Sequence, residues 1–432
     1  MGNTAKKTGR LVALAAAACV AMTLTACGGT SADDAKDGGG FTYWSMWREE
    51  EPQAKVLKAA LDQFQKDTGI TVTVQWTGRD VSKKIGPAIA ANQSPDLWDQ
   101  ANDAIFGATA QAGQALDLSP VLAMAIPGES GTVGDVIPAK YFDMMPKDPA
   151  GSNHYVIPYE VASAGVFYNA ADADLGTAMP SAPSTWDAFL AVCEALKAKS
   201  KPCVASDGGE TWLNELYFDG LLNAGGVDVA KLSADKSGAA WDDPAVLKAA
   251  QQVEQLVKGG YILPGYDATK YPAQETNWAL GKAAFYNNGS WVTAEVAKQV
   301  PAGWKFGSFS VPGARAADAA LFGFAIPKRA KNPGPAQKFI AYFLQKSMLS
   351  GISTTAGNIT PRADIPAPAE LEAVQKTLSA GQVRMVFDGV AGDWQPKVLD
   401  PGYLKLWHGK TTAADFVATA KQAQISFWKT QS

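Results

Sequence analysis

The feature that most constrains the fold is a regular alternation of strand-like and helix-like segments over residues 41–98. Phe41–Ser45 is an apolar, β-prone run, and Ile70–Trp76 alternates apolar with polar residues as half-buried strands do. Pro52–Asp67, between them, has apolar residues at helical spacing. A second helix over Val81–Asn92 and a short strand at Asp96–Trp98 follow. This β-α-β-α-β order favours a largely parallel sheet and therefore an α/β layer fold.

The later sequence extends this pattern over more chain than one domain usually holds. A length of 432 residues favours two lobes. Tyr155–Tyr168 is a long extended segment that Pro158 interrupts, and Pro is poorly tolerated inside a central strand. We therefore expect the chain to cross between lobes there. The further predicted helices are Trp186–Lys199, Pro244–Lys258, Trp291–Gln299, Pro335–Leu344 and Ala413–Trp428, and the further predicted strands are Ala283–Tyr286, Lys305–Ser310 and Gly323–Ile326.

The N-terminal segment has the layout of a secretory leader. Lys6, Lys7 and Arg10 precede the uncharged run Leu11–Ala26, which is shorter than the ~20 residues that a spanning helix needs. The run ends Leu-Thr-Ala-Cys-Gly, which resembles the lipobox of bacterial lipoproteins. That resemblance implies cleavage before Cys27 and lipidation of its thiol. Residues 28–40 lack any aliphatic side chain larger than Ala, and they predict a flexible tether.

Charge and cysteine content exclude several classes of partner. The chain carries 38 Lys and Arg against 42 Asp and Glu, so its net charge is −4 with His neutral. A net negative charge argues against binding to nucleic acid and against a polybasic surface for anionic lipid. We expect membrane contact only through the lipid anchor, and no metal or cofactor. Cys193 and Cys203 remain after the leader and the anchor are set aside, and in an exported protein such a pair predicts a disulfide. Two separate buried thiols are the alternative.

Several ordered motifs together resemble the extracellular solute-binding proteins of family 1, the maltose-binding type that serves ABC sugar importers. They span nearly the whole chain after the tether. The motifs are the opening β-α-β unit with Phe64–Val72, Asn92–Leu97, Ile157–Tyr159 with Val166–Asn169, Pro183–Phe189, Gly281–Phe285 with Asn288–Trp291, Gly323–Lys328 with Ala336–Ile340, and Pro361–Arg362.

This resemblance implies a two-lobed, periplasmic-binding-protein-like fold of type II, with discontinuous lobes joined by hinge crossings. We place lobe one at residues 41–157 and 307–350, and lobe two at residues 158–306 and 351–432. The resemblance further implies a carbohydrate ligand, with an oligosaccharide favoured, and an ABC permease as partner. We also expect a monomer at the outer face of the bacterial cell membrane.

Sugar chemistry adds an argument from the residues themselves. Aromatic rings cover the apolar faces of sugars, and carboxylates, amides and Arg bond the hydroxyl rim. The chain has 13 Trp, and ligands of open α/β sheets sit beyond the carboxyl ends of strands. Side chains near the ends of strands one and three, with two nearby cations, are therefore candidate ligand contacts: Trp44, Trp47, Arg48, Arg79, Asp99 and Gln100. Position relative to the family motifs adds Tyr159, Glu160, Trp212, Asn288, Trp291, Gly323 and Arg362. Trp394 is a further candidate for stacking, although its surroundings depart from the family pattern.

Each candidate also has an ordinary structural interpretation. Any one of these Trp residues can be a core side chain, and either Arg can be a solvated surface charge. No catalytic constellation stands out: neither of the two His, His154 and His408, lies in a nucleophile or zinc motif, and nothing selects a glycosidase pair among the 42 carboxylates. We therefore expect a binding protein and no enzyme. A lipid-anchored glycoside hydrolase or esterase, or a binding protein for a peptide or phospho-compound, is the alternative.

Overall fold

The computed structural model describes residues 39–209, 211–384 and 394–430. Their strands are β1 (Phe41–Ser45), β2 (Val72–Trp76), β3 (Leu97–Ala101), β4 (Ile157–Ala162), β5 (Ala164–Asn169), β6 (Val204–Ala205), β7 (Phe285–Gly289), β8 (Phe306–Phe309), β9 (Ala316–Asp318), β10 (Ala320–Ala325) and β11 (Gln382–Arg384). Their α-helices are α1 (Pro52–Thr68), α2 (Val81–Ala90), α3 (Asn102–Ile105), α4 (Ser119–Leu122), α5 (Val133–Val136), α6 (Lys140–Asp143), α7 (Ala173–Ala178), α8 (Trp186–Lys197), α9 (Thr211–Gly225), α10 (Val229–Ala234), α11 (Pro244–Lys258), α12 (Ala273–Ala279), α13 (Val292–Val296), α14 (Pro333–Phe343), α15 (Lys346–Thr354), α16 (Glu372–Ala380), α17 (Asp400–Trp407) and α18 (Ala413–Thr430).

The first sheet has five strands in the order β2-β1-β3-β10-β4. Strands β1, β2 and β3 are parallel, as the β-α-β-α-β pattern predicts. Strand β10 is antiparallel to both β3 and β4, so the sheet is mixed. Strand β10 follows β9 directly, without the helical crossover that a parallel connection requires. Phe64 of α1 and Phe339 of α14 pack together over one face, beside Phe41.

The predicted crossing over Tyr155–Tyr168 is confirmed. Strand β4 belongs to the five-stranded sheet, and β5, which follows after Ser163, belongs to a second sheet in the order β6-β7-β5-β8. Pro158 lies in β4 opposite Gly323, next to a register shift in β10. Because β4 is an edge strand, the missing N–H of Pro158 leaves no gap in a central ladder.

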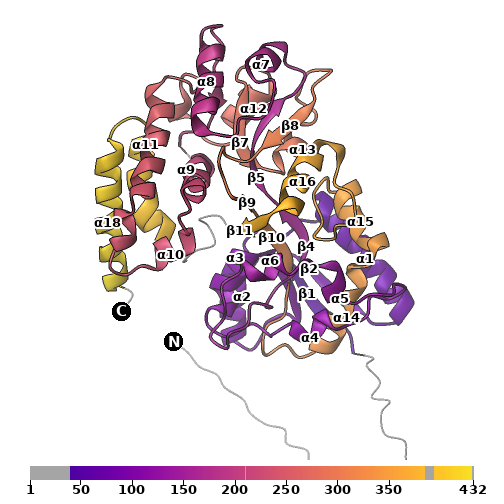
Figure 1. The fold of residues 1–432 in the computed structure, drawn as a ribbon. Helices are drawn as coiled ribbons and strands as arrows, with labels where there is room; N and C mark the ends of the chain where they lie inside the picture. Colours follow the sequence, from indigo (N-terminus) through magenta and orange to yellow (C-terminus); the bar gives the residue numbers. More distant parts are fainter. Residues whose placement is uncertain (1–38, 210, 385–393, 431–432) are drawn as a thin grey trace, which may run out of the picture. The chain divides into compact units, whose positions relative to one another are not determined.

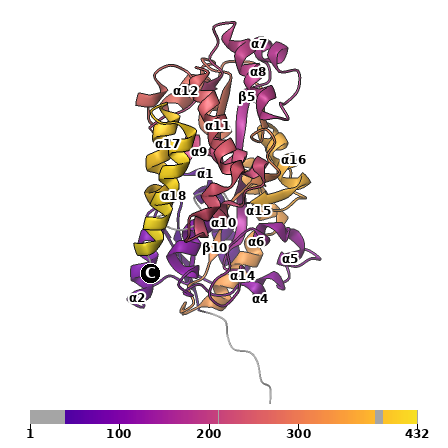
Figure 2. The ribbon, with the colours of Figure 1, turned by 60° about the vertical axis from the view of Figure 1, so that its left-hand side comes forward.

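Helices from distant parts of the chain enclose the second sheet (Figure 1). Helix α18 lies alongside α11 and α17, as Figure 2 shows. The chain returns from β8 to the first sheet through β9, which pairs in parallel with β11. Arg384 of β11 forms ion pairs with Asp219 of α9 (2.8 Å) and Asp318 of β9 (2.6 Å), so this second passage between the sheets is held by a buried charge cluster.

The predicted disulfide between Cys193 and Cys203 is present, with Cα atoms 5.0 Å apart. It joins α8 to the residue just before β6. The helix begins as its sequence predicts, because Thr185 Oγ1 accepts a hydrogen bond from the Ala188 amide at 3.2 Å.

Two sets of predictions are not decided by these elements. The leader, Cys27 and nearly all of the tether lie outside the described residues. The lobe boundaries also stay a prediction; β8 lies in the second sheet, β10 in the first, and α15 packs on α1. Within the described residues, no helix combines the length and apolar character that a membrane crossing requires.

Candidate functional site

Side chains from both sheets line one pair of adjoining cavities. The larger cavity, of about 510 Å³, is lined by Met46, Trp47, Glu51, Pro52, Gln53, Arg79, Glu160, Trp212, Tyr271, Trp291, Ala294, Glu295, Phe322, Ala356 and Asn358. The smaller, of about 170 Å³, shares Trp212, Trp291 and Phe322 with it, and adds Asn102, Asp103, Ser163, Leu216 and Gly289 with five alanines. The site therefore joins the carboxyl end of β1 to residues around β7 and α9.

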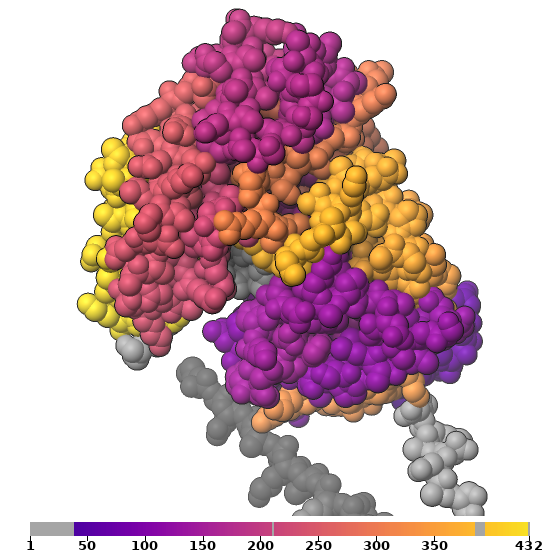
Figure 3. All heavy atoms as spheres, viewed as in Figure 1, coloured from indigo at the N-terminus to yellow at the C-terminus, as the bar shows by residue number. Residues whose placement is uncertain are grey.

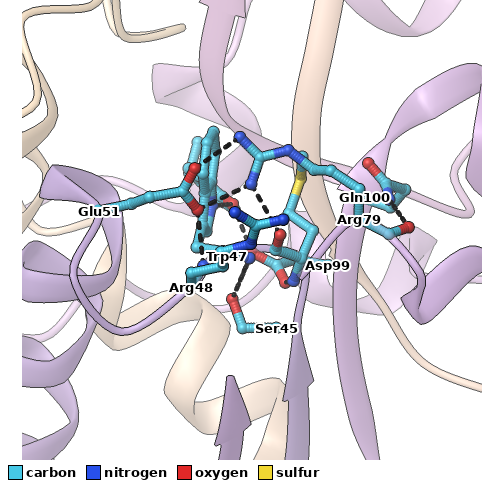
Figure 4. A network of polar contacts seen from close by, with 9 residues as sticks. Ser45, Trp47, Arg48, Glu51, Arg79, Asp99 and Gln100 are labelled. Atoms are coloured by element: carbon cyan, nitrogen blue, oxygen red, sulfur yellow. Dashed lines mark hydrogen bonds and ion pairs between the residues drawn. The ribbon is translucent and has the colours of Figure 1, made fainter. Parts of the chain in front are cut away.

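Trp47 is held rigidly at the wall of the larger cavity. Its Nε1 donates a hydrogen bond to the hydroxyl of Tyr159 at 2.7 Å, and that hydroxyl donates to Oδ2 of Asp99 at 2.5 Å. The guanidinium of Arg79 lies 4.5 Å from the centre of the indole ring. Figure 4 shows this network at the end of β1. The ring is thus fixed before any ligand arrives, which lowers the ordering cost of binding.

Asp99 holds the Tyr159 hydroxyl that positions Trp47, and it does not itself line the cavity. It is fully buried and accepts hydrogen bonds from the Met46 amide (2.8 Å) and Ser45 Oγ (3.4 Å). Burial raises the pKa of Asp99 to about 6, although the hydrogen bond from Tyr159 and the others lower it. The sequence placed Asp99 beyond strand three, but β3 continues to Ala101. The side chain at its carboxyl end is therefore Asn102.

Arg79 is already engaged within the protein. Its Nη1 and Nη2 donate to the two carboxylate oxygens of Glu51 at 2.8 and 2.9 Å, and Nη1 also donates to the Met46 carbonyl at 2.9 Å. These three hydrogen bonds, two of them in a bidentate pair with Glu51, give most of the N–H donors of the guanidinium a partner. Arg79 lines the cavity with its charge compensated.

Glu160 brings an unused acceptor to the cavity. The residue is 2% exposed, and its Oε2 has no hydrogen-bond partner within the described part of the chain. Burial raises the pKa of Glu160 to about 8, against the lowering effects of a hydrogen bond from Gln53 and the charge of Arg79. A buried polar atom without a partner is costly, so this oxygen is well suited to a ligand hydrogen bond.

The opposite wall is formed by aromatic rings. Trp212 packs edge-to-face on Tyr271 with ring centres 5.5 Å apart, and the Tyr271 hydroxyl donates to Oε2 of Glu295. Trp291 lies directly over the backbone of Gly289: a Cβ there would be 2.1 Å from the indole. The Gly-Ser-Trp motif therefore has a packing reason, since the ring occupies the space that any larger side chain would need.

Asn102 supplies a polar group to the smaller cavity. Its Oδ1 accepts from the Leu321 amide at 2.9 Å, while Nδ2 has no partner among the described residues. The side chain is 2% exposed. An amide donor is thus available on the same side as the Glu160 acceptor, and the two are complementary to the hydroxyls of a bound solute.

Three candidate contacts from the sequence lie in packed interior positions. Trp394 is fully buried in the core around α17 and α18, and its Nε1 donates to Gln424 at 2.9 Å. Arg362 is 3% exposed and forms ion pairs with Glu129 and Asp364, each at 2.8 Å. Gly323 has no room for a side chain, because a Cβ would be 2.6 Å from the Ile157 carbonyl oxygen. None of the three lines either cavity.

Four further candidates lie near the site without lining it. Trp44 is half-buried within β1 and packs on the first core. Arg48 is exposed, and its amide donates to Glu51. Gln100 is buried and donates to the Arg79 carbonyl at 3.3 Å, and Asn288 is buried and donates to Glu275 at 3.4 Å. Of the fourteen candidate contacts, five line the cavities: Trp47, Arg79, Glu160, Trp212 and Trp291.

Sequence reasoning missed several lining residues. Gln53, Tyr271, Phe322 and Asn358 carry no local motif. Glu295 had a usable signal, because it follows Trp291 by four residues and so shares its face of a helix.

A separate groove of about 770 Å³ contains none of the fourteen candidates. It is lined by Phe106, Asp143–Pro146, Asn223, Gly226–Ala230, Ala234, Arg315, Val383 and Arg384. Figure 3 shows the surface hollowed between the purple N-terminal part of the chain and the red segment that includes α10.

Comparison with known proteins identifies the family. The sequence profile of the family described as "Bacterial extracellular solute-binding protein" matches residues 59–378, well over half of the chain. The chain belongs to this family. The resemblance drawn from the motifs is confirmed, and membership of a family of solute-binding receptors agrees with the expectation that the protein is not an enzyme.

Two relatives of this solute-binding protein come from Streptomyces coelicolor. The diacetylchitobiose binding protein NgcE is 24% identical over 64% of this chain and 60% of its own length. The diacetylchitobiose binding protein DasA is 24% identical over 97% of this chain and 98% of its own length. For NgcE and two further curated relatives, in contrast to DasA, this chain spans only about half to three fifths of the relative's length.

The fold matches solved structures of the same kind. The apo-form of RafE from Streptococcus pneumoniae superposes with a TM-score of 0.73 at 16% identity, over 91% of this chain and 99% of that chain. The predicted two-lobed α/β fold is therefore confirmed.

Proposed function

We propose that this solute-binding protein captures a carbohydrate, with an oligosaccharide favoured, and delivers it to the permease of an ABC importer. The observation that carries the proposal is the cavity itself. Aromatic rings from opposite sheets, Trp47 on one side and Trp212 and Trp291 on the other, face a space that also contains the unpartnered Glu160 Oε2. Flat apolar walls with a few polar groups suit the alternating faces and rims of sugars.

The relatives support the same class of ligand. NgcE and DasA are both named as diacetylchitobiose binding proteins, and the DasA alignment covers nearly the whole of both chains. The identity of the sugar for this chain depends on the cavity, whose lining comes from residues far apart in the sequence.

Capture proceeds by closure of two lobes with the boundaries proposed above. The passage from β4 to β5 at Ser163 and the return through β9 are the connections about which the sheets move. Sugar binds the walls of both, shifts a pre-existing open–closed equilibrium, and presents the closed form to the permease.

The protein acts as a monomer, held at the outer face of the cell membrane by a lipid on Cys27. The lipobox-like sequence before Cys27 supports this anchor. Replacing the thiol tests it: Cys27→Ser abolishes incorporation of labelled fatty acid and releases the protein into the medium. Retention of lipid by the variant would refute the anchor.

Thermal unfolding against a panel of mono- and oligosaccharides tests the main proposal. The soluble form that begins at Gly28 is used, with the sugars recovered and analysed afterwards. A ligand at 1,000 times its Kd stabilises by about 4 kcal/mol, which a melt resolves easily. We expect one sugar class to raise the Tm and to be recovered intact. No shift with any sugar favours a peptide or phospho-compound, and recovery of cleaved sugar favours a hydrolase.

A further inference from the structure

The charged groups that line the two cavities are predominantly acidic. Four carboxylates line them within the described chain, and Arg79 is the single cation there. Arg79 is paired with Glu51 through two hydrogen bonds of 2.8 and 2.9 Å. The remaining acids, Asp103, Glu160 and Glu295, form no ion pair with a lining cation.

Two of these acids approach the larger cavity from opposite walls. Glu160 lies on β4 of the first sheet, and Glu295 lies on α13, which follows β7 of the second sheet. Glu160 Oε2 is buried without a partner among the described residues, and Glu295 accepts the Tyr271 hydroxyl and shares a hydrogen bond with Glu275. Each wall therefore presents carboxylate oxygen at the cavity, and neither carboxylate forms an ion pair with a lining cation.

A third carboxylate behind Glu295 increases the need for positive charge. Glu275 is 3% exposed, and burial first and the charge of Glu295 second raise its pKa to about 8. Burial thus favours the protonated form of Glu160 and Glu275 in the absence of a ligand, and a cation that enters this space stabilises their ionised form. No cluster of three or more metal-ligating side chains gathers within the described residues, which disfavours a metal ion in this role.

The aromatic walls favour an organic cation. Trp212, Trp291 and Tyr271 line the same cavity as Glu160 and Glu295, and indole faces attract ammonium groups strongly when water is excluded. A neutral sugar uses the rings but supplies no charge that would stabilise the ionised carboxylates.

We propose that the solute is a sugar that carries a protonated amino group, and that Glu160 and Glu295 bind this ammonium from the two walls. The inference rests on the proposed function, because the rings still hold the sugar faces. It adds that the cavity selects an unacylated amino sugar over its N-acetylated and hydroxyl counterparts.

Matched sugars test this selectivity on the soluble form from Gly28 by titration calorimetry at pH 6. The pairs are glucosamine with glucose, galactosamine with galactose, and the β-1,4-linked glucosamine disaccharide with both diacetylchitobiose and cellobiose. We expect the amine to bind at least tenfold more tightly than its counterparts in at least one set. Equal or tighter binding of the neutral sugar in every set that binds overturns this inference and leaves the carbohydrate proposal standing. Absence of binding in all sets overturns this inference, and the carbohydrate proposal fails with it only if the wider sugar panel also gives no thermal shift.

Charge-neutral variants assign the selectivity to the two residues. Glu160→Gln and Glu295→Gln each keep the side-chain shape, and we expect each to weaken amine binding at least tenfold while changing affinity for a neutral sugar less than threefold. Asp62→Asn, which removes an exposed carboxylate on α1 far from the cavities, is the matched control and keeps wild-type selectivity. An equal loss for amine and neutral sugar in both variants means that the carboxylates serve hydroxyls, and it overturns the inference. Thermal melts of each variant without sugar establish that it is folded.

Discussion

The hydroxyl of Tyr159 connects Trp47 to Asp99: it lies 2.7 Å from the indole nitrogen of one and 2.5 Å from a carboxylate oxygen of the other. These residues come from the end of β1, from the edge strand β4 and from β3. A cavity wall is thus fastened to two strands of the first sheet by a single oxygen atom.

Removing that oxygen in Tyr159→Phe leaves the Trp47 N–H without its partner and takes one donor from the buried Asp99. We expect a loss of about 1–3 kcal/mol in the free energy of unfolding, measured by urea denaturation. Sugar affinity falls as well, because Trp47 loses its fixed orientation. Tyr403→Phe is the matched control: its hydroxyl donates to the Asn214 carbonyl at 3.0 Å in the second core, so stability falls and affinity does not. Unchanged affinity in Tyr159→Phe would contradict the role assigned to Trp47.

A methyl group at Gly289 is expected to displace the ring of Trp291, since its carbon would be 2.1 Å from the indole. Gly289→Ala should therefore reduce sugar affinity by about tenfold or more, like loss of an aromatic anchor. Gly165→Ala on the neighbouring β5 is the control, because the nearest atoms there are 3.6 Å away. Calorimetric titration and tryptophan fluorescence measure both effects. Wild-type affinity and fluorescence in Gly289→Ala would show that the ring is placed differently.

Glu160 is expected to make the protein less stable as pH rises. Its carboxyl has an ordinary pKa of 4.5, raised to about 8 by burial in the folded state. Between these values the folded protein binds more protons than the unfolded chain, so the free energy of unfolding falls from about pH 4.5 to about pH 8. Glu160→Gln lacks this titration, and its stability relative to wild type should rise by on the order of a few kcal/mol across the window.

Denaturant melts of both proteins at pH 4.5, 6, 7 and 8 measure this difference. Asp62→Asn again supplies the control, because it removes an exposed carboxylate that lines neither cavity. Parallel profiles for Glu160→Gln and wild type would mean that Glu160 ionises as it does in the unfolded chain.

The disulfide contributes to stability and not to binding. Cys193 and Cys203 are ten residues apart in sequence, and neither lines a cavity. The double replacement Cys193→Ser with Cys203→Ser should lower the free energy of unfolding by about 2–4 kcal/mol, in line with loop closure in the unfolded chain. Affinity for the sugar, measured at a temperature where the variant is folded, should match wild type. Lower affinity would indicate that the bridge positions the site.

Local pattern was sufficient for most elements and insufficient for their ends. Phe41–Ser45 forms a strand with the predicted bounds, whereas the third strand continues past Trp98 to Ala101. Alternation and helical spacing are properties of neighbouring residues, so they identify an element. The end of a strand depends on its partner, and here β10 pairs with β3 as far as Ala101. Because the strand continues to Ala101, Asp99 lies inside β3, where it accepts a hydrogen bond from Tyr159 and does not line the cavity.

The sequence by itself determined the α/β fold, the crossing within Tyr155–Tyr168, the disulfide pair and the family, because each depends on composition, spacing or an ordered set of motifs. Only the tertiary structure separated Trp47, a cavity wall, from Trp394, a core side chain. Both are tryptophans near the end of an element, and their difference lies in partners far along the chain, Tyr159 for one and Gln424 for the other. Burial is set by such long-range contacts. The same reason hid the shared cavity of Glu160 and Glu295, because their elements, β4 and α13, are far apart in the sequence.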